Sequence, residues 1–162
     1  MNAALQGGPA IRTNRTMLYR LLYISTATDQ IDHQELEVIL DGAQTRNAAL
    51  GVTGLLVFTG SHFMQLLEGE QDAVERVFAS ISKDPRHHSL AKIICEPSLS
   101  RACPDWSMML ERPIKGETSA HEVFVPSDRT IAERLPKTMP ADLRLLFESF
   151  RSVMGRQNVA AG

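Results

Sequence analysis

The chain has 162 residues, a formal net charge of −2 at pH 7 and 43% hydrophobic residues. This length is enough for one domain with its own core, and the near-neutral charge argues against nucleic acid as the main partner. The two cysteines, Cys95 and Cys103, lack the spacing of metal ligands, so we expect free thiols, no metal and a cytoplasmic location. No run approaches the roughly twenty apolar residues of a membrane span, so we expect no membrane partner.

The first predicted element is a strand. Residues 1–15 mix Gly, Pro, Asn and Arg without periodicity, and we expect a flexible tail there. The stretch 17–24, MLYRLLYI, is rich in β-forming residues and places Tyr19, Leu21 and Tyr23 on one face. Apolar side chains also occupy the other face, which predicts a central strand.

A helix is predicted to begin near Asp32, where the sequence DHQE is an acidic variant of the capping box. Its apolar stripe consists of Leu36, Ile39, Leu40 and Ala43. Asn47 lies one turn further along the same inward face, an unusual place for a neutral amide. Asn47 therefore either serves recognition or caps the end of its own helix near Leu50 and Gly51.

The stretch 52–70, VTGLLVFTGSHFMQLLEGE, predicts a hairpin with its turn at residues 59–62. Side chains alternate along a strand, so Phe63, Gln65 and Leu67 point one way while Met64 and Leu66 point the other. Both faces are apolar and must be covered. A buried amide without partners costs about 1–3 kcal/mol, so Gln65 should bond either to protein groups or to a bound ligand.

The elements after the hairpin complete a sheet. Residues 70–83 carry a helical stripe, and strands are predicted at 90–95 and 106–110. The helical stripe consists of Val74, Val77, Phe78 and Ile81. The order strand, helix, strand, strand, helix, strand, strand predicts an α+β fold. We expect a ferredoxin-like five-stranded mixed sheet with two helices on one face.

The C-terminal region supplies a cover for the other face of the sheet. A helix is predicted over 141–154, and a shorter one over 128–135. The apolar side of the longer helix carries Leu143, Leu146, Phe147, Phe150 and Met154. We therefore expect a domain over 16–112, a C-terminal helical cap or output region over 113–155 and a flexible tail over 156–162.

Tyr23, Asn47 and Gln65 are a phenol and two amides, which together suit recognition of a planar heterocycle. Around them the chain resembles the BLUF domains, blue-light sensors that use FAD. The resemblance rests on five motifs between residues 17 and 111. These are LLYIS around Tyr23, RN ending at Asn47 with GVTGLLVF after it, FMQLLEG around Gln65, DPRHH at 84–88 and DWSM at 105–108.

The resemblance implies roles for individual residues. Tyr23 would be the photochemical donor of an electron and a proton, and Gln65 the amide between that phenol and the N5/C4=O edge of the flavin. Asn47 would hold the C4=O/N3–H edge. Arg86 and His87 match positions near the flavin and its phosphate tail, with a solvated helix end as the alternative. Light would leave Gln65 rotated or tautomerised and shift the flavin absorption to the red.

Two residues of the last strand would relay the signal. Trp106 and Met108 match positions that change contacts on signalling, and the alternative is that both are simply core side chains. Ser80 and Ser82 stand where some relatives carry another basic or polar side chain, which leaves the phosphate contacts open.

The resemblance also implies how the protein acts. We expect no enzymatic activity in the chain, FAD as cofactor with FMN and riboflavin as alternatives, a homo-oligomer, and a separate signalling protein as partner. A cyclic-dinucleotide phosphodiesterase is the class of partner that the resemblance favours. The competing hypothesis is a light-independent ligand-binding module or small enzyme that uses His62, His87 or Glu68 as acid or base.

Overall fold

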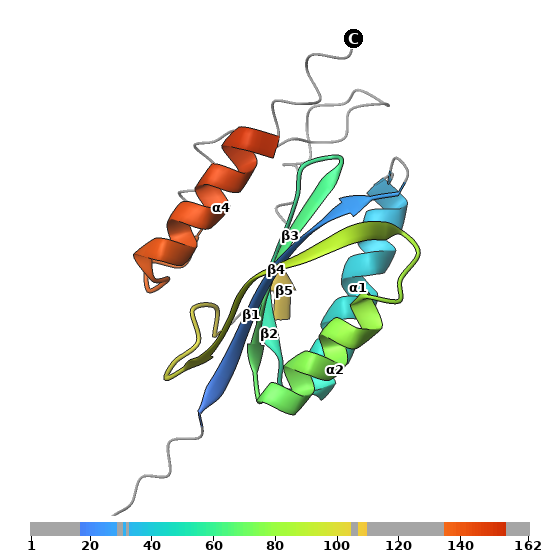
Figure 1. The fold of residues 1–162 in the computed structure, drawn as a ribbon. Helices are drawn as coiled ribbons and strands as arrows, with labels where there is room; N and C mark the ends of the chain where they lie inside the picture. The colour runs from blue at the N-terminus through green and yellow to red at the C-terminus, as the bar shows by residue number, and fades with distance from the viewer. Residues whose placement is uncertain (1–16, 29–30, 32, 105–106, 110–134, 155–162) are drawn as a thin grey trace, which may run out of the picture.

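The structure of the protein is a computed structural model that describes residues 17–28, 31, 33–104, 107–109 and 135–154 (Figure 1). The elements in chain order are β1 (Leu18–Ala27), α1 (His33–Ala49), β2 (Thr53–Phe58), β3 (His62–Gly69), α2 (Gln71–Ile81), β4 (His87–Ser98), β5 (Ser107–Met109) and α4 (Ala141–Met154). Each helix and strand predicted within these ranges is present. The predicted α+β class is confirmed.

The strands form a sheet in the order β4-β1-β3-β2-β5. Strand β1 pairs antiparallel with β3 and β4, and β2 pairs antiparallel with β3. The three-residue strand β5 is parallel to β2, with Gly54 opposite Ser107. Strands β1 and β3 therefore lie inside the sheet, as their apolar faces on both sides predicted.

The hairpin has the predicted turn and the predicted faces. Strands β2 and β3 are joined at Gly60, whose φ of 94° lies in the left-handed region that glycine adopts without strain. Helix α1 ends before Gly51, whose φ of 63° provides a left-handed helix terminus. The proposed N-terminal capping residue, Asp32, lies outside the described residues.

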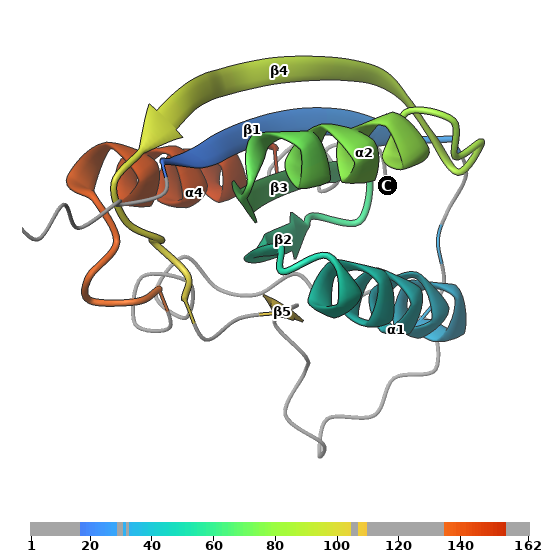
Figure 2. The same cartoon turned by 90° about the horizontal axis from the view of Figure 1, so that it is seen from below.

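Two layers of helices cover the sheet (Figure 2). Helices α1 and α2 pack on one face, and α4 packs on the other. The first core contains Leu21, Tyr23, Leu40, Ala43, Phe63, Leu67, Val74, Val77 and Ile81, among other residues. The second contains Leu22, Leu55, Met64, Leu66, Cys103, Leu143, Phe147 and Phe150, among other residues. The predicted alternation of side chains along β1 and β3 is confirmed.

Some segments differ from their predicted extent. Strand β4 runs for twelve residues, whereas only 90–95 was predicted, because its ends are polar and exposed at the sheet edge. Strand β5 covers Ser107–Met109 within the predicted 106–110. The short helix predicted over 128–135 falls outside the described residues except for Leu135, which is buried in a non-helical bend.

Both cysteines are free thiols: Cys95 is exposed and Cys103 is buried. Within the described ranges, no three His, Cys, Asp or Glu side chains group as a metal site would require. Over the same part of the chain, none of the helices combines the length and apolarity needed to cross a bilayer.

The packing of α4 gives a test with an internal control. Phe147 is fully buried against the sheet, so Phe147→Ala should lower the free energy of unfolding by about 3–5 kcal/mol. Leu145 lies on the same helix and is 63% exposed, so Leu145→Ala should change it by only about 0.5 kcal/mol. Urea unfolding followed by circular dichroism measures both. Equal losses would contradict the assigned orientation of α4.

Candidate functional site

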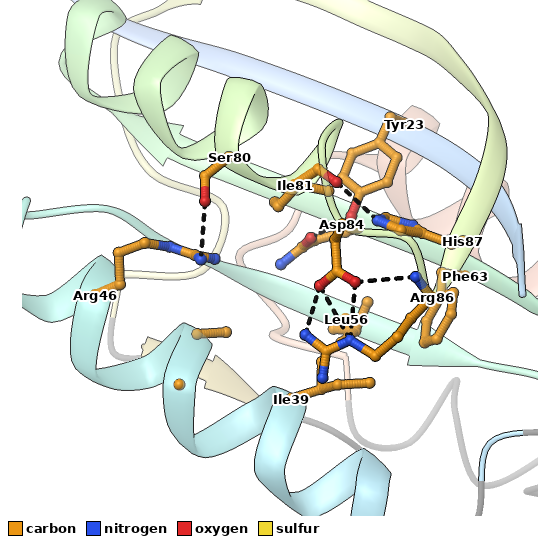
Figure 3. Close-up of a pocket in the computed structure, with 13 residues that line it drawn as sticks. Tyr23, Ile39, Arg46, Leu56, Phe63, Ser80, Ile81, Asp84, Arg86 and His87 are labelled. Atoms are coloured by element: carbon orange, nitrogen blue, oxygen red, sulfur yellow. Dashed lines mark hydrogen bonds and ion pairs between the residues drawn. The ribbon is translucent and has the colours of Figure 1, made fainter.

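A cavity of about 160 Å³ lies between α1 and α2, above one face of the sheet (Figure 3). Its lining combines apolar side chains with a phenol, an amide, an imidazole and several charged groups. The lining residues are Tyr23, Ile39, Gly42, Ala43, Arg46, Leu56, Phe63, Gln65, Ser80, Ile81, Asp84, Arg86 and His87. A mostly apolar pocket with a few convergent polar groups is typical of a cofactor site.

Tyr23 and Gln65 form the floor of this cavity. They are opposite each other in the register of β1 and β3, so their side chains rise from neighbouring points on the same face. The Tyr23 hydroxyl donates a hydrogen bond of 2.5 Å to Gln65 Oε1. Gln65 is only 3% exposed, which confirms the expected burial. The sequence left open whether the Gln65 amide bonds to protein groups or to a ligand. One of its partners is a protein group, the Tyr23 hydroxyl.

The environment of Tyr23 keeps its phenol protonated. Burial raises the pKa of Tyr23 well above its ordinary value of about 10, Arg46 opposes this shift and Asp84 adds to it. The Phe78 ring lies edge-on to the phenol, with 5.3 Å between centroids. A neutral phenol that donates to an amide oxygen can release its proton only along that hydrogen bond.

Asn47 is fully buried near the end of α1, but it is not among the residues that line the cavity. Neither its amide nitrogen nor its amide oxygen has a hydrogen-bond partner within the described chain. The backbone carbonyl of Asn47 accepts from Leu50 and Val52, whereas the side chain caps nothing. The helix-cap alternative is therefore wrong for the side chain, and the amide remains available to a ligand.

Arg46 precedes Asn47 and lines the cavity. Its Nη1 is 3.5 Å from the Ser80 hydroxyl of α2, and its Nε is buried without a partner in the part of the chain described (Figure 3). Neither residue was assigned to the site from sequence: Arg46 appeared only within the RN motif, and Ser80 only as a departure from the family pattern. The signal was nevertheless present, because Ile39, Ala43 and Arg46 share one helical face at spacings of three and four.

Arg86 and Asp84 stand at the mouth of the cavity. The guanidinium binds the carboxylate through two nitrogens, with 2.9 Å from Nε to Oδ1, and the Arg86 backbone N–H also donates to Oδ1. These hydrogen bonds hold the pKa of Asp84 below its ordinary range. The two side chains remain partly exposed, so the ion pair can exchange for a ligand contact at modest cost.

His87 lines the cavity with its ring but has both nitrogens engaged. Nε2 donates to the carbonyl of Ile81 at 2.9 Å, and Nδ1 lies 2.8 Å from the Ser25 hydroxyl, which must then donate to it in the neutral ring. The ring also packs edge-on against Phe63. His87 therefore lines the cavity with its ring, but neither of its nitrogens is free to bond to a ligand.

The remaining candidates lie away from the cavity or outside the described chain. Trp106 is outside the described residues, and Met108 is placed only by its backbone, inside β5. Among the residues suggested for a competing enzyme, Glu68 faces the opposite side of the sheet, where its carboxylate is fully engaged. His62 contacts Ser61 in the hairpin turn.

The residues present fit a flat heterocycle. Gln65 and the Tyr23 phenol border the cavity, and the buried amide of Asn47, which has no partner among the described residues, can take a donor and an acceptor side by side. A flavin ring offers such an N–H and C=O edge, and the apolar side chains from α1, Leu56 and Ile81 suit its faces.

The chain was compared with known proteins. Residues 18–109 match the family model described as "BLUF: Sensors of blue-light using FAD". The blue light- and temperature-regulated antirepressor BluF of Escherichia coli K12 is 38% identical over 85 residues, or 52% of this chain and 21% of that protein. The chain thus spans about a fifth of that relative.

Solved structures agree in fold. The dark-state structure of BlrB, a BLUF protein, is 36% identical with a TM-score of 0.55, covering 59% of this chain and 73% of that one. BlrP1 of Klebsiella pneumoniae, solved with FMN and cyclic diGMP, is 26% identical with a TM-score of 0.68. That match covers 86% of this chain and 36% of BlrP1.

The raised pKa of Tyr23 predicts a pH dependence. Its stabilising contribution is complete below the unfolded pKa of about 10 and is lost as the pH rises toward the folded pKa. In Tyr19→Phe, Tyr23 is the sole tyrosine, because the chain has two. Phenolate absorbance of this variant should appear only well above pH 10, or together with unfolding. The urea-unfolded variant supplies the reference, and native titration at that reference pH would contradict the burial of the phenol.

Proposed function

The chain belongs to the BLUF family of blue-light sensors using FAD, and from this we propose that it binds a flavin non-covalently and switches through Tyr23 and Gln65. The observation that carries the proposal is the 2.5 Å hydrogen bond between these residues at the floor of the cavity. The buried amide of Asn47 on α1, which has no partner among the described residues, adds support. BLUF domains are sensory modules, and a light-independent enzyme or binding module is not favoured. The flavin-binding domain would be residues 16–112.

Each polar residue would contact a different part of the flavin. Asn47 would hold the C4=O/N3–H edge, and Gln65 would lie between that edge and the Tyr23 phenol. Arg86, with Arg46 beside Ser80, would lie toward the ribityl and phosphate tail, because these cations surround the cavity mouth. We propose FAD from the family description, while FMN and riboflavin present the same ring to these residues.

The switch would consist of one hydrogen-bond exchange. When bound, the flavin absorbs blue light and becomes a strong oxidant. Tyr23 would give up an electron, which makes its phenol strongly acidic, and its proton would move toward Gln65 Oε1 along the existing hydrogen bond. After the electron and the proton had returned to Tyr23, the Gln65 amide would remain rotated or tautomerised. Such an exchange of hydrogen bonds changes the free-energy difference between two conformations by about 1–3 kcal/mol. This is enough to shift the populations of the two conformations but not to unfold a helix or strand.

The signal would reach the other face of the sheet through β3. Met64 and Leu66 flank Gln65 on this strand and pack in the core that contains α4. We propose residues 113–155 as the output region, and a separate cytoplasmic protein as partner. The cyclic diGMP bound to the related BlrP1 supports a cyclic-dinucleotide phosphodiesterase as the class of partner. A homo-oligomer would present several output regions together.

We also infer that the sheet is ferredoxin-like. The strand order β4-β1-β3-β2, with α1 and α2 on one face, supports this assignment. Strand β5 would be the family's fifth strand, with Trp106 and Met108 as relay residues.

Replacing Gln65 tests the proposed switch directly. Gln65→Leu should leave flavin bound, because the cavity keeps its apolar walls, but should abolish the light-induced red shift. Absorption spectra before and after blue light measure this. Gln71→Leu removes an exposed amide from α2 and should keep the full shift. A normal shift in Gln65→Leu would refute the assigned role.

Asn47 tests the cofactor contact apart from the photochemistry. Asn47→Leu removes a buried amide that has no partner in the described part of the chain, so the flavin-free protein should be at least as stable to urea as before. Flavin binding should weaken about 10- to 100-fold, the equivalent of about 1–3 kcal/mol. Fluorescence titration with FMN and FAD measures the affinity. Gln44→Leu, on the same helix but outside the cavity, should bind normally. Unchanged affinity in Asn47→Leu would remove this contact from the proposal.

A further inference from the structure

A buried carboxylate lies on the face of the sheet opposite the cavity. Glu68, in the second-last position of β3, is 1% exposed, and its carboxylate accepts four hydrogen bonds. The Ala102 N–H donates to both oxygens at 2.9 and 2.8 Å, and the Cys103 N–H donates to Oε2 at 3.0 Å. Arg20 Nε donates to Oε1 at 3.0 Å. Three of these bonds come from the backbone just before β5.

Arg20 supplies the balancing charge. It is 6% exposed and lies between Glu68 and Glu96 in the register of β3, β1 and β4. Its Nη1 is 3.4 Å from the half-exposed Glu96 carboxylate, and its Nη2 is 3.4 Å from the Ser100 carbonyl. A carboxylate buried this deeply requires such a partner, because an uncompensated buried charge is strongly destabilising.

The preceding residue, Arg101, holds the same segment through a second set of hydrogen bonds. Arg101 Nη1 donates to the Glu68 carbonyl at 2.6 Å and to the Thr53 hydroxyl at 2.8 Å, and its Nη2 donates to the Gly51 carbonyl at 2.7 Å. Gly51 directly follows the C-terminal turn of α1, which carries Asn47. Residues 101–103 are thus attached at once to β3, to β2 and to the end of α1.

We propose that Glu68 is a positioning residue that anchors residues 101–103, so that a change at Gln65 moves β5 instead of being absorbed by the preceding segment. This inference rests on the proposed function, and it assigns the coupling between the switch and β5 to named contacts. Gln65 and Glu68 lie on the same strand three residues apart, on opposite faces. Only residues 104–106 separate the anchored segment from β5.

Strand β5 depends on this anchor because its own pairing is small. It has three residues and, among the described strands, pairs only with β2, with register partners at Gly54 and Leu55. A strand this short has few backbone hydrogen bonds of its own. Fixing the segment before it would limit the freedom of β5 further, so that small shifts of β2 and β3 are transmitted to it.

Glu68→Gln tests the anchor with little change of shape. An amide nitrogen cannot accept a hydrogen bond, so either Arg20 or a backbone N–H must lose its partner. The amide is also uncharged, so it holds the backbone N–H groups more weakly in either orientation, and the amides of Ala102 and Cys103 should exchange with solvent about tenfold faster in the dark. The flavin red shift should be retained. Glu96→Gln is the matched control, because it alters the exposed partner of Arg20 and leaves the backbone contacts intact.

The effect on coupling is read at Trp106, the single tryptophan of the chain. Its indole N–H gives one resonance in a nitrogen–proton NMR spectrum, recorded in the dark and under blue light. The light-induced change should be at least about threefold smaller in Glu68→Gln than in the wild type and in Glu96→Gln. Arg101→Met, which removes the second set of hydrogen bonds from a partly exposed side chain, should reduce the change in the same direction.

The outcomes separate this inference from the proposed function. Fast amide exchange and a reduced Trp106 response with a normal red shift support the anchor. Amide exchange at Ala102 and Cys103 that is as slow in Glu68→Gln as in the wild type overturns it. So does a full Trp106 response in both Glu68→Gln and Arg101→Met. In either case a normal red shift still supports the switch. If Glu68→Gln does not fold, Arg101→Met alone decides. Absence of a red shift or of any Trp106 response in the wild type overturns the inference together with its premise.

Discussion

Strand β3 lies inside the sheet between β1 and β2 and is buried on both faces, and this double burial constrains everything else in the site. Alternation puts Gln65 under α1 and α2 while Met64 and Leu66 face α4. Cores this dense do not deform continuously, so a change on one face must be accommodated on the other. One strand is thus both the floor of the cavity and part of the opposite core.

Three buried polar side chains of the fold, Gln65, Glu68 and Asn47, differ in how far their hydrogen bonds are satisfied. Gln65 accepts a short hydrogen bond from Tyr23, and Glu68 has its carboxylate fully engaged by Arg20 and two backbone amides. Asn47 has no side-chain partner among the described residues. Buried amides normally have hydrogen-bond partners, so the Asn47 side chain favours a ligand more directly than that of Gln65, whose oxygen is already engaged.

Periodicity predicted the elements and their faces well, because hydrophobic burial dictates both. Helix α4 begins and ends at the predicted residues, since Pro140 precedes it and its apolar stripe is unbroken. Strand β4 was predicted too short, because a sheet edge tolerates polar residues that carry no alternation. The pairing of β1 with β4 and of β2 with β5 depends on tertiary contacts that spacing does not encode.

Within the site, sequence predicted the residues better than their contacts. The family resemblance placed Gln65 beside the Tyr23 phenol, but spacing alone could not, because their hydrogen bond follows from a strand register that joins residues 42 positions apart. Arg46 and Ser80 were named in the motifs but not assigned to the cavity, because polar residues on a helix normally indicate a solvated face. The engagement of both His87 nitrogens could not be predicted either, since it requires the Ile81 carbonyl at the end of α2.

The energy scale of the site indicates which element responds first. Exchange of one amide hydrogen bond is worth about 1–3 kcal/mol, which changes an equilibrium between two conformations by about 5- to 150-fold. Helix α4 buries Leu143 and Phe147 completely, so detaching it would require more energy than this. Strand β5 has three residues and, in the part of the chain that the structure describes, one neighbouring strand, which places its displacement within reach. We therefore expect light to displace β5 first. Helix α4 should respond only as far as the displacement is transmitted through the core that it forms with Leu55 and Met64.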